Sequence, residues 1–365
     1  MIIGCTKILQ DEMGVIAKKS GSEEKELFSW SANLIKIKRR KAVIVVNDSN
    51  RFGFVLFGLK AKDFKKIDEL ILQGIKRYLQ QLKIKEEIIE QYLSDAGAII
   101  YSKTKGPGYV ARLNKACELV GYFEDLLNLE NIYQDKVSRK LNDDYVKIDK
   151  SNYMLPYELL LEDFKETYKD SIIKCEAANL IVKLDLGVYT AERRIITPID
   201  INFKELHEIL QIAFDWKECH LHEFKIINEK DEQVLHIISE NVDEFDLYGR
   251  ECKVVFESDI FIKDYVKEGM TLRYCYDFGD GWQHEIIFKG IMLDYDKNHP
   301  ICIEGIGDAP PEDVGGITGY EDFLEIMANT KHPEHEGMKR WADSQRYKKF
   351  DIDLVNRRLK YVLWK

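Results

Sequence analysis

The chain has 365 residues and a formal net charge of -10, and 45% of its residues are hydrophobic against 32% that are charged. This balance is typical of a globular protein with two domains. No apolar run reaches the length of a membrane-spanning helix and the N-terminus does not resemble a signal peptide, so we expect a cytoplasmic protein with no membrane partner. The seven cysteines never form a C-x-x-C pair, which predicts reduced thiols rather than disulfides or a zinc knuckle.

Residues 1–130 predict a small α+β domain with a basic strand. Strands are expected at 2–6, 27–41, 42–46, 52–57 and 98–102. Helical spacing of apolar residues is found at 61–82, 85–95 and 110–127. Residues 131–170 mix charges with weak periodicity and are predicted to be a linker, with a short helix at 156–168.

Residues 171–365 predict a second α+β domain. Its strands follow one another through hairpins with few helical crossovers, which favours an antiparallel sheet. Helices are expected at 203–214, at 320–328 after a capping box of Thr318 and Glu321, and beyond Phe350. We therefore predict an α+β fold of two domains, each a mainly antiparallel sheet packed with helices.

Charge is distributed unevenly between the two halves of the chain. Residues 1–150 carry 27 Lys and Arg against 21 Asp and Glu, a balance of +6, and the remainder has a balance of -16. The acidic half would repel a phosphate backbone, so nucleic-acid binding is expected only in the first half, through residues 36–66. The basic side chains there are Lys36, Lys38, Arg39, Arg40, Lys41, Lys60, Lys62, Lys65 and Lys66. The alternatives are a solvated cationic face and a surface that docks on the acidic half.

The segment from Tyr274 to His284, YCYDFGDGWQH, combines reactive side chains with two glycines. Alternating apolar residues lead into it and out of it, which predicts a strand, a kink and a second strand. The glycines permit positive φ or the close approach of another group. The segment is therefore either a functional site or a difficult turn.

Carboxylates and imidazoles around this segment form the first candidate site. The candidate catalytic residues are Asp277, Asp280, His284, Glu312 and Asp313, and the candidate metal ligands are His220, His222, Asp280 and His284. Such a set suits zinc, manganese or iron, and a bound metal could activate water for hydrolysis. His220 and His222 are two residues apart, so on a strand they would share one face. Alternatively, the acids accept backbone N–H groups in tight turns and the histidines fill a polar seam.

Aromatic and basic side chains form the second candidate site. The residues predicted to bind a ligand are Tyr276, Trp282, Trp216, Arg193 and Arg194. Aromatic rings could stack on a base or another flat ligand. The alternative is that the rings belong to the core, which is the usual role of aromatic residues at strand spacing.

Three segments carry a family resemblance. They are LIVKLDLG through FKELHEILQIAFDWKECHLHEF, MTLRYCYDFGDGWQHEI, and GDAPPEDVGGITGYEDFLEIM. In content and order they resemble the plasmid pRiA4b ORF-3-like family over about residues 175–345. The resemblance implies an uncharacterised protein that occurs on plasmids and as a passenger of insertion sequences. Where many members have cysteines, this chain has Ala309 and Val314, so a cysteine-dependent metal or redox role is not expected.

The N-terminal part resembles a small uncharacterised prokaryotic domain, through MIIGCTK and through Trp30 before IKIKRRK. No H-E-x-x-H, G-x-S-x-G or phosphate-binding glycine motif occurs in the chain. Our leading hypothesis is therefore a non-enzymatic binding or accessory module from a plasmid or mobile element, whose acidic, aromatic-lined cleft takes a small ligand or a protein partner. The alternatives are a metal-dependent hydrolase that uses the Asp, His and Glu cluster, and a nucleic-acid accessory protein that acts through the basic strand.

Overall fold

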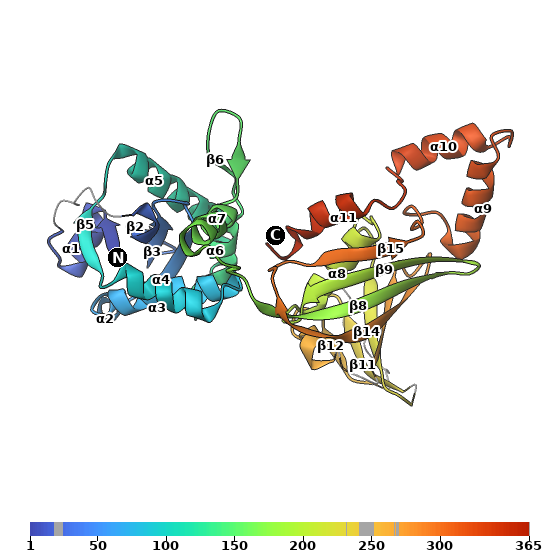
Figure 1. Ribbon diagram of the computed structural model, residues 1–365, viewed down its shortest axis with the longest axis horizontal. Coiled ribbons are helices and arrows are strands. Elements are labelled where there is room, and N and C mark those ends of the chain that lie inside the picture. The colour runs from blue at the N-terminus through green and yellow to red at the C-terminus, as the bar shows by residue number, and fades with distance from the viewer. Residues whose placement is uncertain (18–24, 231, 241–251, 266, 268–269, 365) are drawn as a thin grey trace. The chain divides into compact units, whose positions relative to one another are not determined.

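A computed structural model describes residues 1–17, 25–230, 232–240, 252–265, 267 and 270–364. The chain divides into two compact units, Met1–Lys174 together with Trp364, and Cys175–Leu363. Each unit combines a β-sheet with helices, which confirms the predicted two-domain α+β fold (Figure 1). All seven cysteines are free thiols, and every described helix is too short or too polar to cross a bilayer.

The first unit is built on a five-stranded sheet of order β4-β3-β2-β1-β5. Its strands are β1 (Ile2–Cys5), β2 (Ser29–Ile37), β3 (Arg40–Asn47), β4 (Gly53–Leu59) and β5 (Ile100–Lys103). β1 pairs in parallel with β2 and with β5, whereas the other pairs are antiparallel. The helices are α1 (Lys7–Met13), α2 (Ala61–Phe64), α3 (Ile67–Gln81), α4 (Glu86–Ala96), α5 (Pro107–Tyr122), α6 (Asp135–Asn142) and α7 (Pro156–Tyr168).

Alternating side chains of the sheet pack against helices on both of its faces. Phe54 of β4 stacks on Tyr78 of α3, with ring centroids 5.3 Å apart. Val55, the next residue, belongs to a core cluster with apolar residues of α5 and α6. Because successive strand residues point to opposite faces, a sheet covered on both sides needs a nearly continuous apolar strand. β4 has this pattern in GFVLFGL.

Residues 131–170, predicted to be a linker, lie within the first unit. They form α6, the short hairpin β6 (Val146–Lys147) and β7 (Tyr153–Met154), and α7. The α6 side chains of Ser138 and Asn142 accept hydrogen bonds from the β4 backbone N–H groups of Val55 and Gly53. Phe164 of α7 is fully buried. The expected helix at 156–168 is present as α7, whereas α6 was not predicted because its few apolar residues stand among charges.

The second unit is built on an eight-stranded sheet of order β12-β11-β10-β13-β14-β8-β9-β15. Its strands are β8 (Cys175–Leu186), β9 (Tyr189–Pro198), β10 (His222–Ile227), β11 (Gln233–Ile238), β12 (Val254–Phe256), β13 (Thr271–Tyr276), β14 (Trp282–Tyr295) and β15 (Ile301–Ile306). Only β11 and β12, among the described strands of this sheet, pair in parallel. Its helices are α8 (Phe203–Ala213), α9 (Gly316–Ala328), α10 (His335–Ser344) and α11 (Ile352–Leu359).

Helix α8 supplies the centre of the second core. Its start is fixed by a capping box, in which the Asn202 side chain accepts from the Glu205 N–H and the Glu205 carboxylate accepts from the Asn202 N–H. The buried α8 residues pack with the inner faces of β13 and β14. The segment that follows α8 leads directly to β10, next to β13 in the sheet. The end of α8 and the β13–β14 turn are therefore close together.

Candidate functional site

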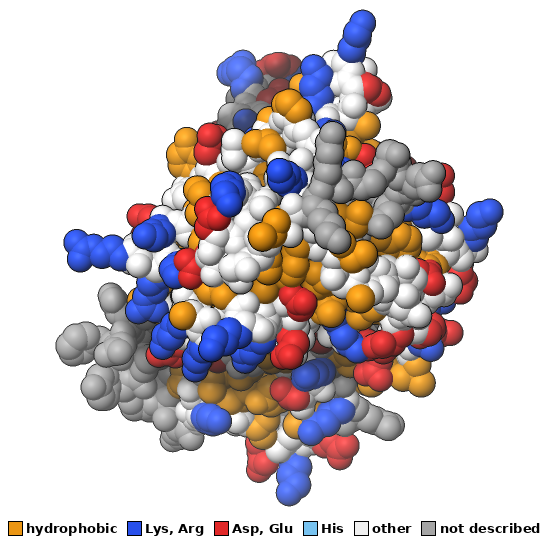
Figure 2. All heavy atoms as spheres, turned by 90° about the vertical axis from the view of Figure 1, so that its left-hand side faces the viewer, with side chains coloured by type: hydrophobic (Ala, Val, Ile, Leu, Met, Phe, Trp, Pro, Cys, Tyr) orange, Lys and Arg blue, Asp and Glu red, His pale blue; other side chains and the backbone are white. Residues whose placement is uncertain are grey.

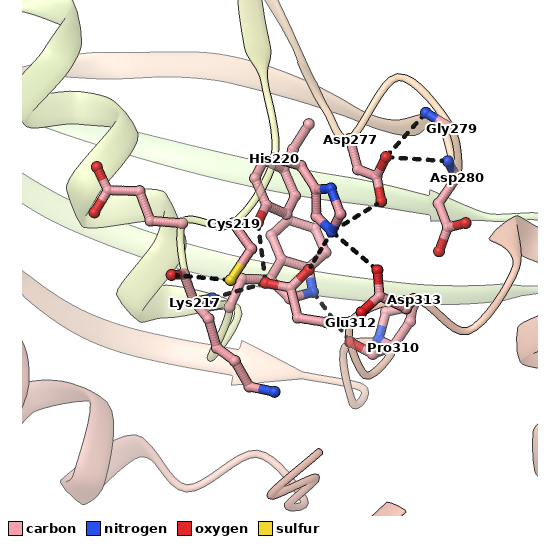
Figure 3. Close-up of polar contacts among 12 residues, drawn as sticks. Lys217, Cys219, His220, Asp277, Gly279, Asp280, Pro310, Glu312 and Asp313 are labelled. Carbon is pink, nitrogen blue, oxygen red and sulfur yellow. Dashed lines mark hydrogen bonds and ion pairs between the residues drawn. The ribbon is translucent and has the colours of Figure 1, made fainter. Parts of the chain in front are cut away.

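The turn between β13 and β14 is held by Asp277. This residue has a positive φ of 56°, as does Gly281 with 73°. Asp277 Oδ1 accepts hydrogen bonds from the backbone N–H groups of Gly279 (2.9 Å) and Asp280 (3.3 Å). Asp277 N–H in turn donates to Leu221 O at 3.0 Å. One carboxylate oxygen of Asp277 is thus used by the turn, and the other, Oδ2, points toward the segment before β10 (Figure 3).

The proline-containing loop between β15 and α9 is fixed at both ends. Near its start, the indole N–H of Trp216 donates to Pro310 O at 3.0 Å. Near its end, Asp280 Oδ2 accepts from the Gly315 N–H at 3.2 Å. A Cβ at Gly316 would lie 3.0 Å from Asp280 O, so this close approach favours glycine. The β13–β14 turn and this loop therefore support each other.

Glu312 belongs to this loop and is buried, with 3% of the residue exposed. Its Oε1 accepts from the Lys217 N–H at 2.7 Å and from the Tyr276 hydroxyl at 3.0 Å. Burial and the nearby Glu312 charge raise the pKa of Tyr276 well above its usual range, so the hydroxyl stays protonated and donates. The same hydroxyl oxygen accepts from the Cys219 N–H at 3.1 Å. Glu312 is therefore oriented through Oε1, and Oε2 makes no hydrogen bond.

His220 lies where these segments converge. Its Nε2 is 3.1 Å from Asp313 Oδ1, 3.6 Å from Asp277 Oδ2 and 3.8 Å from Glu312 Oε2. The His220 Nε2 and Glu312 Oε2 atoms are inaccessible to solvent and make no hydrogen bond. We call these four residues the His220 cluster (Figure 3). Asp313 has 59% of its side chain exposed, so the cluster opens to solvent on that side.

Two of the predicted metal ligands lie elsewhere. β10 begins at His222, so His220 precedes the strand and the two imidazoles do not share a face. His222 Nε2 lies 2.6 Å from Glu257 Oε2, and its ring stacks on His207 at 3.5 Å. His284 is fully enclosed; burial lowers its pKa to about 3 and keeps its ring neutral. Both rings belong to the polar interior of the unit and not to the cluster.

Asp280 is close to the cluster without joining it. Its Oδ2 binds the backbone of Gly315, which makes it a positioning residue for the loop. His207 was not predicted at all. Burial, and then the charge of His222, lower the pKa of His207 to about 2, and the only sequence signal was its place on the apolar face of α8.

Comparison with known proteins places the second unit in a family. Residues 176–358 match the model of the plasmid pRiA4b ORF-3-like protein. The chain belongs to the plasmid pRiA4b ORF-3-like family. Residues 2–159 match a domain of unknown function, DUF6933. This confirms the resemblance carried by the three sequence motifs and by the N-terminal segment.

Two relatives each match about half of the chain. The uncharacterized protein y4hQ of Sinorhizobium fredii (strain NBRC 101917 / NGR234) is 31% identical over 168 residues, which are 46% of this chain and 81% of the relative. The second is the crystal structure of a protein of unknown function, MM3350 from Methanosarcina mazei Go1, whose sequence is 32% identical. The match covers 49% of this chain and 96% of MM3350, and the TM-score is 0.42.

The aromatic residues predicted to bind a ligand form the core of the pRiA4b ORF-3-like unit. Trp216, Tyr276 and Trp282 are each no more than 2% exposed. Trp216 stacks on Tyr276, with ring centroids 4.8 Å apart, and lies 6.4 Å from Trp282. No ligand can stack on rings that are covered in this way. Two of them instead position the loop of the cluster, because Trp216 donates to Pro310 O and Tyr276 donates to Glu312 Oε1. The strand face that carries Tyr276 and Trp282 packs with α8, as in the alternative in which these rings belong to the core.

Arg193 and Arg194, also predicted to bind a ligand, face opposite sides of β9. Arg193 is 1% exposed and donates to the carbonyl groups of Ala213, Glu192, Ile306 and Gly307. Burial lowers its pKa to about 10. Arg194 is partly exposed and lies 3.8 Å from Glu304. Arg193 therefore joins the end of α8 to the loop that carries Glu312, and neither arginine reaches the cluster.

The basic strand of the first unit is engaged by its own chain. Lys38 forms an ion pair with Asp125 at 2.9 Å, Lys41 pairs with Glu12, and Arg40 donates to Leu129 O at 3.1 Å. On the face shown in Figure 2, Lys and Arg side chains are separated by acidic and hydrophobic ones. A nucleic acid would need these cations as phosphate contacts. Ion pairs of the kind that Lys38 and Lys41 form are typical of a solvated charged face, which was one of the alternatives for this strand.

Proposed function

We propose that the pRiA4b ORF-3-like unit is a binding module that holds one divalent metal ion at the His220 cluster. The observation that carries this proposal is the convergence of ligand atoms that the fold leaves unused. His220 Nε2 and Glu312 Oε2 make no hydrogen bond although both are inaccessible to solvent. Buried polar atoms are normally hydrogen-bonded, and these two approach each other and the other carboxylates only at ion-pair distance, which points to a cation between them.

His220, Asp277 and Asp313 each offer one ligand atom, and these atoms lie within 4.8 Å of one another, which agrees with one ion. Glu312 stands outside this set, with Oε2 3.8 Å from His220 Nε2. Ligand atoms that lie about 2.1 Å from a metal in tetrahedral or octahedral geometry are about 3.0–3.4 Å apart. The separations from His220 Nε2 are 3.1, 3.6 and 3.8 Å. One is within this span, and the other two need a contraction of a few tenths of an ångström.

The groups around the cluster resemble the outer shell of a metal site. Asp277 and Glu312 each use one oxygen for backbone N–H groups, which orients the other oxygen. Such hydrogen bonds fix metal-ligating carboxylates and are typical of metal centres. Lys217 cannot balance the negative charge, because its ammonium group donates to Gln345 at 2.7 Å and points away from the carboxylates (Figure 3). A nitrogen and three carboxylate oxygens suit manganese, iron or zinc.

The metal would stand at the edge of a groove. A cavity of about 590 Å³ is lined by Asp313, Val314, Met338, Arg340 and Trp341. Because Asp313 belongs to both the cluster and the groove, a ligand in the groove could complete the coordination of the metal. We propose this as the ligand site of the module, with a small molecule or a short segment of a partner protein as its occupant.

Metal-dependent hydrolysis is the second candidate function. The exposure of Asp313 and the adjoining groove favour it, because a metal lowers the pKa of a bound water and a substrate could reach that water. Release of p-nitrophenolate from p-nitrophenyl esters or phosphates by the metal-loaded protein would support this function. Turnover that persists after removal of the metal would contradict it.

Calorimetric titration of metal-stripped protein with Mn²⁺ and Zn²⁺ tests the binding proposal. We expect one ion per chain, and an affinity at least tenfold weaker in Asp313→Asn, which removes a ligand charge at an exposed position. The matched control is Asp294→Asn, an exposed acid near the far end of β14. Equal affinity in Asp313→Asn and the wild type, or an equal loss in Asp294→Asn, would refute the proposal.

A further inference from the structure

A second cavity lies entirely within the first unit. Its volume is about 260 Å³, and it is bounded by the end of β3, the turn that follows, α5, α6 and the β6–β7 hairpin. Its apolar lining includes Val46, Ala116, Leu141 and Pro156, all buried. Four cationic side chains and one acidic side chain complete it, and these are Arg51, Arg112, Lys115, Lys147 and Asp144.

The charges around this cavity do not balance. Lys115 pairs with Asp144 at 2.7 Å, which leaves Arg51, Arg112 and Lys147. Arg112 Nη1 donates to the backbone carbonyl of Asp48 at 3.0 Å, so its guanidinium keeps further donors available. The cavity therefore has a surplus of three positive charges.

Arg51 is the most informative of these residues. It is half-buried, yet within the described part of the chain its guanidinium makes no hydrogen bond or ion pair. Burial, and then the charge of Arg112, lower the pKa of Arg51, as expected for two cations that approach each other without a carboxylate between them. A guanidinium without a protein partner keeps its N–H donors available for a ligand.

The backbone holds Arg51 in place. Its φ is 65°, and its N–H donates to Asn47 O at 3.1 Å. The flanking residues are fixed as well, because Asn47 Oδ1 accepts from the Ser49 N–H and Asn50 Oδ1 accepts from the Phe52 N–H. A turn that is tied by these bonds fixes the point and direction from which the Arg51 side chain leaves the backbone, which reduces the entropic cost of binding.

We propose that this cavity binds a small organic phosphate. The phosphomonoester group would lie between Arg51 and Arg112, and its organic part would lie on Val46, Leu141 and Pro156. Guanidinium groups bind phosphate through paired hydrogen bonds, and a surplus of three positive charges favours a dianion over a carboxylate. The volume lies near the lower limit of about 300 Å³ for small-molecule sites, which favours a compact organic group.

Calorimetric titration of the full chain with phenyl phosphate, inorganic phosphate and benzoate tests the proposal. We expect phenyl phosphate to bind at least tenfold more tightly than either of the others, because it alone supplies both the dianion and the apolar ring. Equal affinity for phenyl phosphate and inorganic phosphate would overturn the role of the apolar lining. Tighter binding of a 5′-phosphorylated oligonucleotide than of phenyl phosphate would overturn the assignment to a small molecule.

Two variants and one control locate the site. Arg51→Asn removes the charge with a residue that tolerates positive φ, and Arg112→Gln removes the second charge from the exposed face of α5. We expect each to weaken phenyl phosphate binding at least tenfold. Arg39→Asn is the matched control, since Arg39 is exposed, has a φ of 64° and lies outside the cavity. Unchanged affinity in both cavity variants, or an equal loss in the control, would contradict the proposal.

Discussion

Replacement of Arg193 by methionine should destabilise the second unit strongly. The substitution keeps most of the side-chain volume and removes the donors to Ala213 O and to the 306–307 turn. It also removes the guanidinium that lies 3.7 Å above the Phe350 ring. The carbonyl groups of Ala213, Ile306 and Gly307 would lose this donor. The end of α8 and the start of the Glu312 loop would then no longer be joined through Arg193.

The size of the effect follows from these contacts. A hydrogen bond to a charged group contributes about 1.5–3 kcal/mol, and Arg193 makes such bonds in two separate directions. Part of this gain is offset by the cost of burying the guanidinium, which is evident in its lowered pKa of about 10. We therefore expect the free energy of unfolding to fall by about 3 kcal/mol.

Urea unfolding followed by tryptophan fluorescence measures this loss, and Arg194→Met provides the control. Arg194 is the next residue on β9, and its ion pair with Glu304 is exposed on both sides. Such surface pairs contribute about 0–1 kcal/mol. A loss below about 1 kcal/mol in Arg193→Met, or equal losses in the two variants, would refute the structural role that we assign to Arg193.

Two further predictions concern the backbone and the pH dependence of stability. A Cβ at Gly307 would overlap the carbonyl oxygen of Thr190, whereas a Cβ at Gly281 would meet no other atom. In urea unfolding, the free energy of unfolding should fall by more than about 2 kcal/mol in Gly307→Ala and by about 1 kcal/mol in Gly281→Ala. Similar losses in the two variants would contradict the close approach of Gly307 to Thr190. The pKa of His284 is about 3 in the folded protein and 6.5 in the unfolded chain. Between pH 6.5 and pH 3, the His284 imidazole is protonated in the unfolded chain but not in the folded protein. The free energy of unfolding should therefore fall as the pH drops below 6.5, by at most about 1.4 kcal/mol per pH unit. His284→Gln should flatten this slope between pH 6.5 and 5, and an unchanged slope would argue against a buried neutral ring.

Local patterns predicted much of the fold. Alternating apolar residues located β13 and β14, and helical periodicity located α8 and α3. The parallel pairing of β1 with both β2 and β5 was not predicted, because neither partner follows β1 through a hairpin and β5 pairs Ile100 with Ile2. The capping box of Thr318 and Glu321 was wrong, since α9 begins at Gly316 after a left-handed Gly315.

The candidate site was predicted in part. Density of reactive residues singled out Asp277, Glu312, Asp313 and His220, and these four converge. The sequence could not separate His220 from His222, because that depends on the residue at which β10 begins. It also could not show that Arg193 points inward and Arg194 outward, which follows from the register of β9 against β8 and β15.

An anomalous-difference map from crystals soaked in Mn²⁺ tests the metal proposal most directly. We expect a single strong peak about 2.0–2.3 Å from His220 Nε2 and from the facing oxygens of Asp277, Glu312 and Asp313. Protein carrying Asp313→Asn, soaked in the same way, should show a weaker peak or none. A map without a peak at the His220 cluster, at a Mn²⁺ concentration that produces peaks elsewhere on the protein, would contradict the account.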